Sequence, residues 1–368
     1  MLEGTRDPQI LTRYVPILKA KEGEFRALGE LDASIKASIV PIFEVPSIPW
    51  DYVADAPAKG IDAHLSPVIE KVRVAWGGAQ LAYLDVDLLP DDSLATGQHA
   101  VDALFAEAAS ANLLLVPVAG LERPASEIAA IAAVVGRDGR GLCLRLIPDD
   151  FVSNTGRPLL ARIDQVLSDI GVVPVDVDLV LDVGSIPTGQ VGVLTIAWST
   201  IISSLPYLTR WRTFAFAATA FPATLAGIST GITPISRDEW TLYQRLIGTG
   251  LPRDPDFGDY AIAHPELSDI DPRLMQMSAS IRYTTETEWL IVKGRSVKRE
   301  GFEQTLALAR LLLTRAEARP SAHCPGCGYI RRRAAGATSP GNATTWRRIG
   351  TVHHLSTVVR QLANFPDP

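Results

Sequence analysis

The sequence predicts an α/β chain built on a (β/α)₈ TIM-like barrel, with a C-terminal hairpin, helix and basic segment. Eight apolar runs rich in Val, Ile and Leu alternate with longer stretches of helical spacing. The runs are apolar almost without interruption, as parallel strands covered on both faces require. The 368 residues suffice for a barrel of roughly 250 residues and an extension. We expect the barrel over residues 1–275 and the extension, packed on it, over residues 276–368.

The expected strands occur at regular intervals along the first three quarters of the chain. Their ranges are Tyr14–Ala20, Ser38–Pro46, Leu81–Leu89, Asn112–Leu121, Gly141–Pro148, Val177–Gly184, Arg212–Pro222 and Gly258–Glu266. An open doubly wound sheet is the main alternative. The first strand is followed by LKAKEGEF, without the Gly-x-Gly-x-x-Gly turn of a dinucleotide site, which favours the barrel.

The extension has a different pattern. Residues Ile281–Gly294 predict a β-hairpin with Thr285 and Glu286 at its turn, and Phe302–Ala318 predicts an amphipathic helix. A loop rich in Gly, Pro and Ser and a final helix over His354–Asn364 complete the chain.

Composition excludes several classes of protein. The net charge of −6 gives no long-range attraction to nucleic acid or to an anionic membrane, and apolar residues at 47% predict a sizeable core. Three cysteines do not make a disulfide framework. The first residues lack the pattern of a secretory signal, and no apolar run is long enough to span a bilayer. We therefore expect a cytoplasmic protein with no membrane partner.

Charged side chains lie near the C-terminal ends of the expected strands, where barrel enzymes carry their active sites. Each except Asp87, which follows Asp85, lies two residues after an apolar or aromatic residue of the same parity. They are Lys19, Glu44, Asp85, Asp87, Arg145, Asp182 and His264. The fourth and seventh strands offer only Pro117, Ala119 and Ala218. We predict Lys19, Glu44, Asp182 and His264 as catalytic residues, and Arg145 as a contact to substrate.

Carboxylates that converge on one rim repel one another unless positive charge compensates them. Oxygen ligands suit Mg²⁺ or Mn²⁺, so we predict a metal site made by Glu44, Asp85, Asp87 and Asp182. The alternative is a structural network of ion pairs with Lys19 and Arg145. A Schiff base on Lys19, or a glycosidase that uses Glu44 and Asp182, are further hypotheses.

Two features of the extension could add to a site. Arg282 and Tyr283 begin the hairpin, and we expect them to fold over the barrel mouth and bind an anionic substrate. Cys324 and Cys327 form a Cys-Pro-Gly-Cys motif with His323, His353 and His354 near it in sequence. This spacing suits structural Zn²⁺, whereas the lack of a second Cys-x-x-Cys favours free thiols in a loop.

Basic residues crowd the end of the chain, and Asp367 is the single acid after Ser321. The arginines are Arg331, Arg332, Arg333, Arg347, Arg348 and Arg360. They could contact nucleic acid or a phage protein, or they could form a solvated face.

Five segments of the chain, in this order, resemble the "beta protein" family of phages and bacteria. They are YVPILKAKEGEFRAL, SIVPIFEVPSIPW, FGDYAIAHPE, IRYTTETEWLIVKG and ATTWRRIGTVHHLSTVVRQLA. The resemblance implies an accessory gene of phage or antiviral defence regions and assigns no catalytic residue. The HCPGCG segment is not part of the family pattern.

Two functions follow from the sequence. The first is a barrel enzyme, a metal-dependent hydrolase or lyase, that acts on an anionic small molecule or a phosphodiester. The second is a non-catalytic scaffold that recognises a phage or host component. No Walker A, His-Glu-x-x-His or Gly-x-Ser-x-Gly motif occurs in the sequence, which argues against P-loop, zincin and α/β-hydrolase chemistry.

Overall fold

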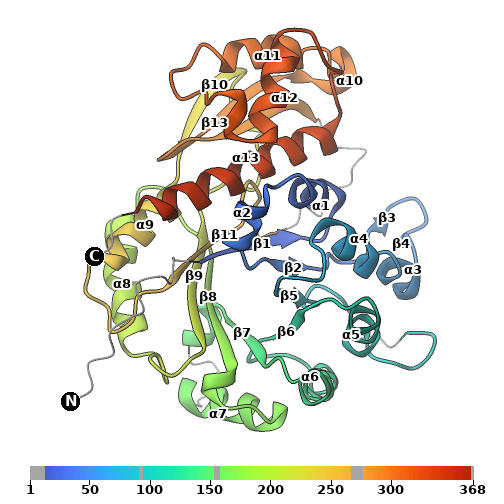
Figure 1. Cartoon of the computed structure of the whole chain (residues 1–368), viewed down its shortest axis with the longest axis vertical. Helices are drawn as coiled ribbons and strands as arrows, with labels where there is room; N and C mark the ends of the chain where they lie inside the picture. Colours follow the sequence, from blue (N-terminus) through green and yellow to red (C-terminus); the bar gives the residue numbers. More distant parts are fainter. Residues whose placement is uncertain (1–12, 91–93, 153–157, 267–276, 366–368) are drawn as a thin grey trace.

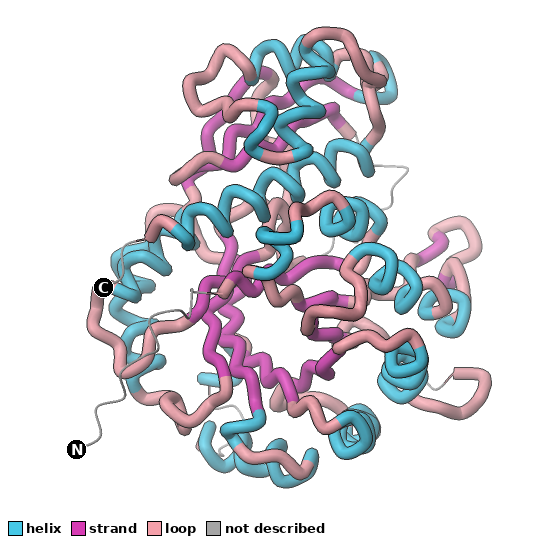
Figure 2. Tube along the Cα trace, in the orientation of Figure 1, coloured by secondary structure: helices cyan, strands magenta, loops and turns pink. Residues whose placement is uncertain are grey.

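Eight parallel strands form a closed barrel in the computed structural model, which describes residues 13–90, 94–152, 158–266 and 277–365 (Figures 1 and 2). The strand order around the barrel is β1-β11-β9-β8-β7-β6-β5-β2. The strands are β1 (Tyr14–Lys19), β2 (Ile42–Glu44), β5 (Ala82–Asp85), β6 (Leu115–Ala119), β7 (Leu142–Leu146), β8 (Val177–Ser185), β9 (Thr213–Thr219) and β11 (Asp256–Asp259). The predicted fold class is confirmed, and each strand overlaps its predicted range.

Helices surround the barrel, because the outward residues of each strand are apolar as well as the inward ones. These helices are α1 (Glu22–Gly29), α2 (Ala33–Ala37), α3 (Ile61–Leu65), α4 (Val68–Ala75), α5 (Ala100–Ser110), α6 (Ala125–Asp138), α7 (Leu159–Ile170), α8 (Val191–Ser203) and α9 (Asp238–Ile247). A two-stranded ribbon, β3 (Trp50–Asp51) and β4 (Ala56–Pro57), follows β2. No helix in the described part of the chain is long and apolar enough to cross a membrane.

A small subdomain lies beside the barrel (Figure 1). Its sheet has the order β10-β13-β12, and it contains the predicted hairpin with Thr285 and Glu286 in the turn. The elements are β10 (Gly231–Ser236), β12 (Ser278–Thr284), β13 (Glu288–Ser296), α10 (Val297–Glu300), α11 (Thr305–Leu312) and α12 (Pro325–Ala334). The segment predicted as a loop therefore contains α12, which Cys324 caps and Pro325 begins.

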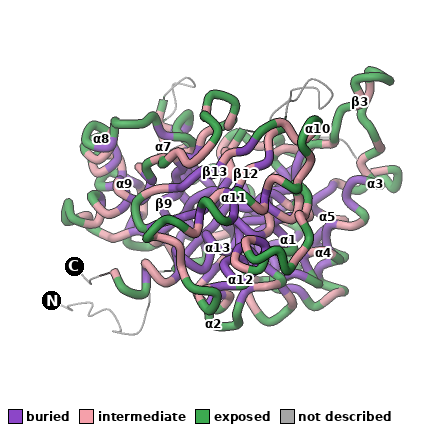
Figure 3. The backbone as a smooth tube through the Cα atoms, turned by 90° about the horizontal axis from the view of Figure 1, so that it is seen from above, coloured by how far each residue is buried: buried purple, intermediate pink, exposed green. Residues whose placement is uncertain are grey.

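The last helix, α13 (Ala343–Ala363), returns to the barrel and is buried along most of its length (Figure 3). It packs against α1 and β1 on one side and against α12 and β12 on the other. Val352, Leu355 and Val358 belong to the layer between strands and helices of the barrel. Trp346 and Ile349 belong to the core of the small subdomain. Thus α13 occupies the position around the barrel that belongs to the helix of the eighth βα unit, although β12 to α12 come between the two in sequence.

Two elements cross the boundary predicted at residue 275. Strand β10 precedes the boundary yet pairs with β13, and α13 follows it yet covers β1. The reason is that strands pair through the backbone, so a short run such as Gly231–Ser236 can join a sheet without a distinctive apolar pattern.

A buried polar chain fixes α13 to the barrel. The hydroxyl of Tyr14 donates a hydrogen bond of 2.5 Å to Asp259 Oδ1, and His354 Nε2 lies 2.8 Å from Asp259 Oδ2. On its other side, His354 Nδ1 lies 2.9 Å from Thr284 Oγ1. This chain connects β1, β11, α13 and β12, so the barrel and the small subdomain share one set of buried contacts.

Truncation of Leu355 tests whether α13 is part of the barrel. Leu355→Ala removes a fully buried side chain and should lower the free energy of unfolding by about 2–5 kcal/mol. Leu311→Ala, on α11, is the matched control because Leu311 is 38% exposed, and it should cost about 0.5 kcal/mol or less. Urea unfolding measures both values. Equal losses for the two variants would contradict the assignment of α13 to the barrel.

Candidate functional site at the barrel mouth

Five of the predicted site residues meet at the C-terminal ends of the strands. Side chains alternate between the two faces of a strand, and the inward set includes Ile17, Ile42, Tyr83, Cys143 and Val180. Two residues further along, the same parity places the charged groups inside the barrel mouth. These are Lys19, Glu44, Asp85, Arg145 and Asp182, each at most 8% exposed.

Arg145 is the centre of this cluster. Its Nε and Nη2 donate to Asp182 Oδ2 at 2.9 and 2.6 Å, and Nη1 donates to Glu44 Oε1 at 2.8 Å and to Asp85 Oδ2 at 2.7 Å. Nη2 also donates to the hydroxyl of Tyr260 at 2.8 Å. Because all three guanidinium nitrogens already have acceptors, Arg145 is a structural partner of the acids here and has no donor group left over for a substrate.

Two more cations complete the cluster. Lys19 forms an ion pair with Glu44 and donates to the carbonyl of Pro265 at 2.9 Å. Arg123, from the loop after β6, contacts Asp85 at 2.9 Å and Asp87 at 2.8 Å. The carboxylates therefore bind arginine and lysine. They do not form a cluster of metal ligands among the residues that the structure describes, and the predicted Mg²⁺ or Mn²⁺ site stays a prediction.

The ion pairs set the protonation of Asp85. Burial by itself would raise the pKa of this carboxyl group, but the charges of Arg123 and Arg145 outweigh burial and lower the pKa to about 2. Asp85 is therefore charged at neutral pH although it is completely buried.

His264 lies past the end of β11 and not within a strand, because the eighth strand ends at Asp259 and Ala261 has a positive φ of 51°. Its Nδ1 accepts a 3.2 Å hydrogen bond from the backbone of Glu266. Burial lowers the pKa of His264, and so does the positive charge of Lys19. At neutral pH the ring is consequently neutral, with its remaining proton on Nε2.

Arg282 contacts the loop after β11 at the edge of the mouth, and a second arginine lies beside it. Arg282 Nη1 donates to the carbonyl of Ile262 at 2.8 Å, and Arg347 Nη1, from α13, donates to the same oxygen at 3.0 Å. The Arg282 guanidinium also lies 5.1 Å from the centre of the Phe221 ring. Burial, and then the charge of Arg347, lower the pKa of Arg282 well below its usual range.

Tyr283 does not lie at the mouth. Neighbouring residues of a strand point to opposite faces, so Tyr283 enters the core of the small subdomain while Arg282 faces the barrel. There the Tyr283 ring stacks on His353 at 3.9 Å, and its hydroxyl lies 3.7 Å from Cys327 Sγ. The predicted role of Tyr283 in substrate binding at the mouth is therefore wrong.

The basic residues near the C-terminus mostly bind groups of their own chain. Arg331 donates to the carbonyl of Arg319, and Arg333 contacts Glu303 at 3.0 Å. Arg348 pairs with Glu30 at 2.7 Å, and Arg360 donates to the carbonyl of His323. These contacts favour a structural use of the arginines over a free basic surface.

Sequence reasoning missed three residues of the site. Tyr260 donates to Asp182 at 2.5 Å, but the predicted strand runs on to Glu266 and therefore places His264, not Tyr260, at the rim of the barrel. Arg123 belongs to a loop outside the predicted strands. Arg347 lies in α13, and the sequence predicts that this helix begins only at His354, seven residues after Arg347. Tyr260 has the same inward parity as Ile262 and His264, so parity was the available signal, but parity does not show where the strand ends.

These observations define a (β/α)₈ barrel protein with an inserted α+β subdomain and a charged barrel mouth. The chain belongs to the beta protein family, whose sequence profile matches residues 14–360, and the predicted resemblance is thereby confirmed.

Similarity to other known proteins is weak. A triosephosphate isomerase from Bartonella henselae is similar in structure, with a TM-score of 0.36 and 11% sequence identity over 67% of this chain and 91% of that chain. A likeness at this level carries no information about function. No curated protein matches the sequence.

Neutralising Asp85 tests the charge cluster. The carboxyl group has a pKa of about 2 in the folded chain and 3.8 ordinarily, so its contribution to stability is complete above pH 3.8 and is lost as pH falls toward 2. Asp85→Asn should lower the free energy of unfolding at pH 7 by about 2 kcal/mol or more. Denaturant unfolding between pH 7 and the acid limit should show this difference shrinking below pH 4.

Asp32→Asn is the control, because Asp32 is exposed and its side chain caps no backbone group of α2. A pH-independent difference for Asp85→Asn would show that its ion pairs do not stabilise the fold through charge.

Proposed function

We propose that the barrel mouth binds a small anionic ligand, such as a phosphorylated molecule, and that the protein is an enzyme acting on it. The observation that carries the proposal is the convergence of Arg282 and Arg347 on the carbonyl of Ile262. Glu24 contributes the nearby negative charge, with an oxygen 3.7 Å from Arg347 Nε.

Two adjacent guanidinium groups repel each other, and partial burial removes the water that would screen them. The lowered pKa of Arg282 expresses this cost. An anion between the two groups would relieve the repulsion, and a guanidinium fork matches the oxygens of a phosphate or carboxylate. The pair also comes from two different elements, β12 and α13, so the bound anion would connect both of them at the mouth.

Groups suited to proton transfer lie along the same loop. Lys19 donates to Pro265, which directly follows His264, and Lys19 in turn pairs with Glu44. We propose that His264, neutral and protonated at Nε2, donates a hydrogen bond to the ligand. In this proposal Lys19 and Glu44 exchange protons with the ligand. Asp182 holds Arg145 and Tyr260 in this proposal and does not contact the ligand.

Anion binding can be measured without knowing the natural ligand. We expect inorganic phosphate and phosphorylated metabolites to raise the melting temperature of the protein relative to chloride at equal ionic strength. Arg282→Gln and Arg347→Gln should each weaken binding by about tenfold or more, because a hydrogen bond to a charged group contributes about 1.5–3 kcal/mol.

Arg295→Gln is the matched control, since Arg295 is exposed on β13 and pairs with the surface residue Glu300. It should leave the shift unchanged. If no anion stabilises the wild-type protein, or if the control loses as much as the two variants, the mouth does not bind anions through this pair. For a substrate found in the screen, His264→Asn should reduce turnover more than binding.

A further inference from the structure

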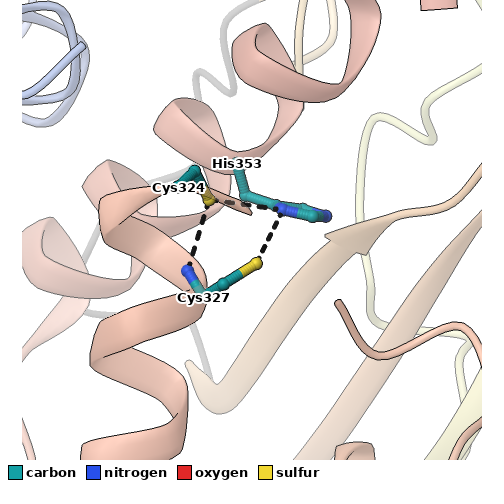
Figure 4. Close-up of side chains that lie close together, drawn as sticks. All are labelled: Cys324, Cys327 and His353. Atoms are coloured by element: carbon teal, nitrogen blue, oxygen red, sulfur yellow. Dashed lines mark hydrogen bonds between the residues drawn. The ribbon is translucent and has the colours of Figure 1, made fainter. Parts of the chain in front are cut away.

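The small subdomain brings two thiols and an imidazole together in its core (Figure 4). His353 Nδ1 lies 3.6 Å from Cys324 Sγ and 3.4 Å from Cys327 Sγ. All three residues are buried, and their candidate ligand atoms lie within 4.8 Å of one another. They form the one group of this kind that the described part of the chain contains.

The local sequence explains why both sulfurs face the same way. Cys324 is the N-cap of α12, Pro325 begins the helix, and the backbone N–H of Cys327 donates to Cys324 Sγ at 3.3 Å. Gly326 lies so close to α13 that a Cβ atom would be 2.6 Å from the carbonyl oxygen of Ile349. The glycine thus lets the turn approach α13 where His353 is located.

The hydrogen bond that His353 makes on the side away from the two sulfurs fixes its tautomer. Its Nε2 lies 2.8 Å from the carbonyl oxygen of Thr284, which can only accept a hydrogen bond. Nε2 therefore carries the proton, and the lone pair of Nδ1 points toward the two sulfurs. A backbone carbonyl on the far nitrogen is the usual outer partner of a histidine that binds metal. The stacked ring of Tyr283 holds the imidazole in this orientation.

We propose that Cys324, Cys327 and His353 bind a transition-metal ion of the zinc class, which joins α12 to α13 beneath the small sheet. In tetrahedral zinc sites, bond lengths of about 2.3 Å to sulfur and 2.0–2.1 Å to nitrogen separate these ligands by about 3.6 Å. The two observed distances are close to that value. Soft sulfur ligands select zinc-class ions over Mg²⁺ or Ca²⁺.

The charges also agree with such an ion. Two thiolates and a neutral imidazole balance a divalent cation, and the resulting neutral group fits a core made of apolar residues such as Ile330 and Ile349. His323 is not a member of the group, because its ring contacts Thr357 and Arg360. Among the described residues, three protein ligands therefore form the group. His354 points away, to Asp259.

The inference is tested on the full chain, purified under reducing conditions without chelator. Metal analysis should find about one zinc ion per chain, and replacement by Co²⁺ should give the visible bands and the thiolate charge-transfer band of a tetrahedral site. Cys324→Ser, Cys327→Ser and His353→Gln should each raise the Kd for Zn²⁺ by more than about 100-fold. Circular dichroism confirms that each variant is folded.

Two controls make the test specific. Cys143→Ala removes the third cysteine, which lies inside the barrel, and His323→Asn removes the histidine next to the motif; both should retain the metal. Wild-type protein that neither contains nor takes up Zn²⁺ or Co²⁺ would overturn the proposal, as would a disulfide between Cys324 and Cys327 in the purified chain. Loss of metal in His323→Asn would overturn the three-residue ligand set.

Discussion

The structure depends on the return of α13 to cover β1 and β11. Every strand of the barrel has an apolar outer face that needs a helix, and the next strand that the structure describes after the eighth, β12, belongs to the small subdomain. The layer of helices around the barrel is completed only by α13, the final helix of the chain. All elements from β12 to α12 are consequently held between the eighth strand and its helix, and they cannot lie far from the barrel mouth.

This arrangement gives α13 two buried faces, and the adjacent histidines show how they are used. Successive residues of a helix point about 100° apart. His354 therefore reaches Asp259 on the barrel side, while His353 reaches Cys324 and Cys327 in the small subdomain. About two turns earlier, Arg347 reaches the loop after β11. A single helix thus positions the candidate metal ligand, the candidate anion contact and the barrel wall.

The charged mouth is a second constraint. Lys19, Arg123 and Arg145 carry three positive charges, and five carboxylates contact them: Glu44, Asp85, Asp87, Glu127 and Asp182. A buried network of this kind stabilises a fold little more than apolar residues of the same size would. Its position at the C-terminal ends of the barrel strands is instead typical of a functional site, where charged groups with shifted pKa values collect. The excess of acid in the cluster explains why anion binding is assigned to the arginines outside it.

The sequence by itself determined the eight strands and the parity of their side chains, because the strands follow from local apolar runs and the parity follows from the alternation of side chains along a strand. From that parity came the convergence of Lys19, Glu44, Asp85, Arg145 and Asp182. Only the tertiary structure decided which of these groups pair, that the last strand ends before His264, that β10 joins the hairpin, and that His353 completes the group begun by Cys324 and Cys327. These features depend on contacts between segments far apart in sequence. Residue periodicity carries no information about such contacts, because it specifies which face a side chain occupies but not what lies opposite.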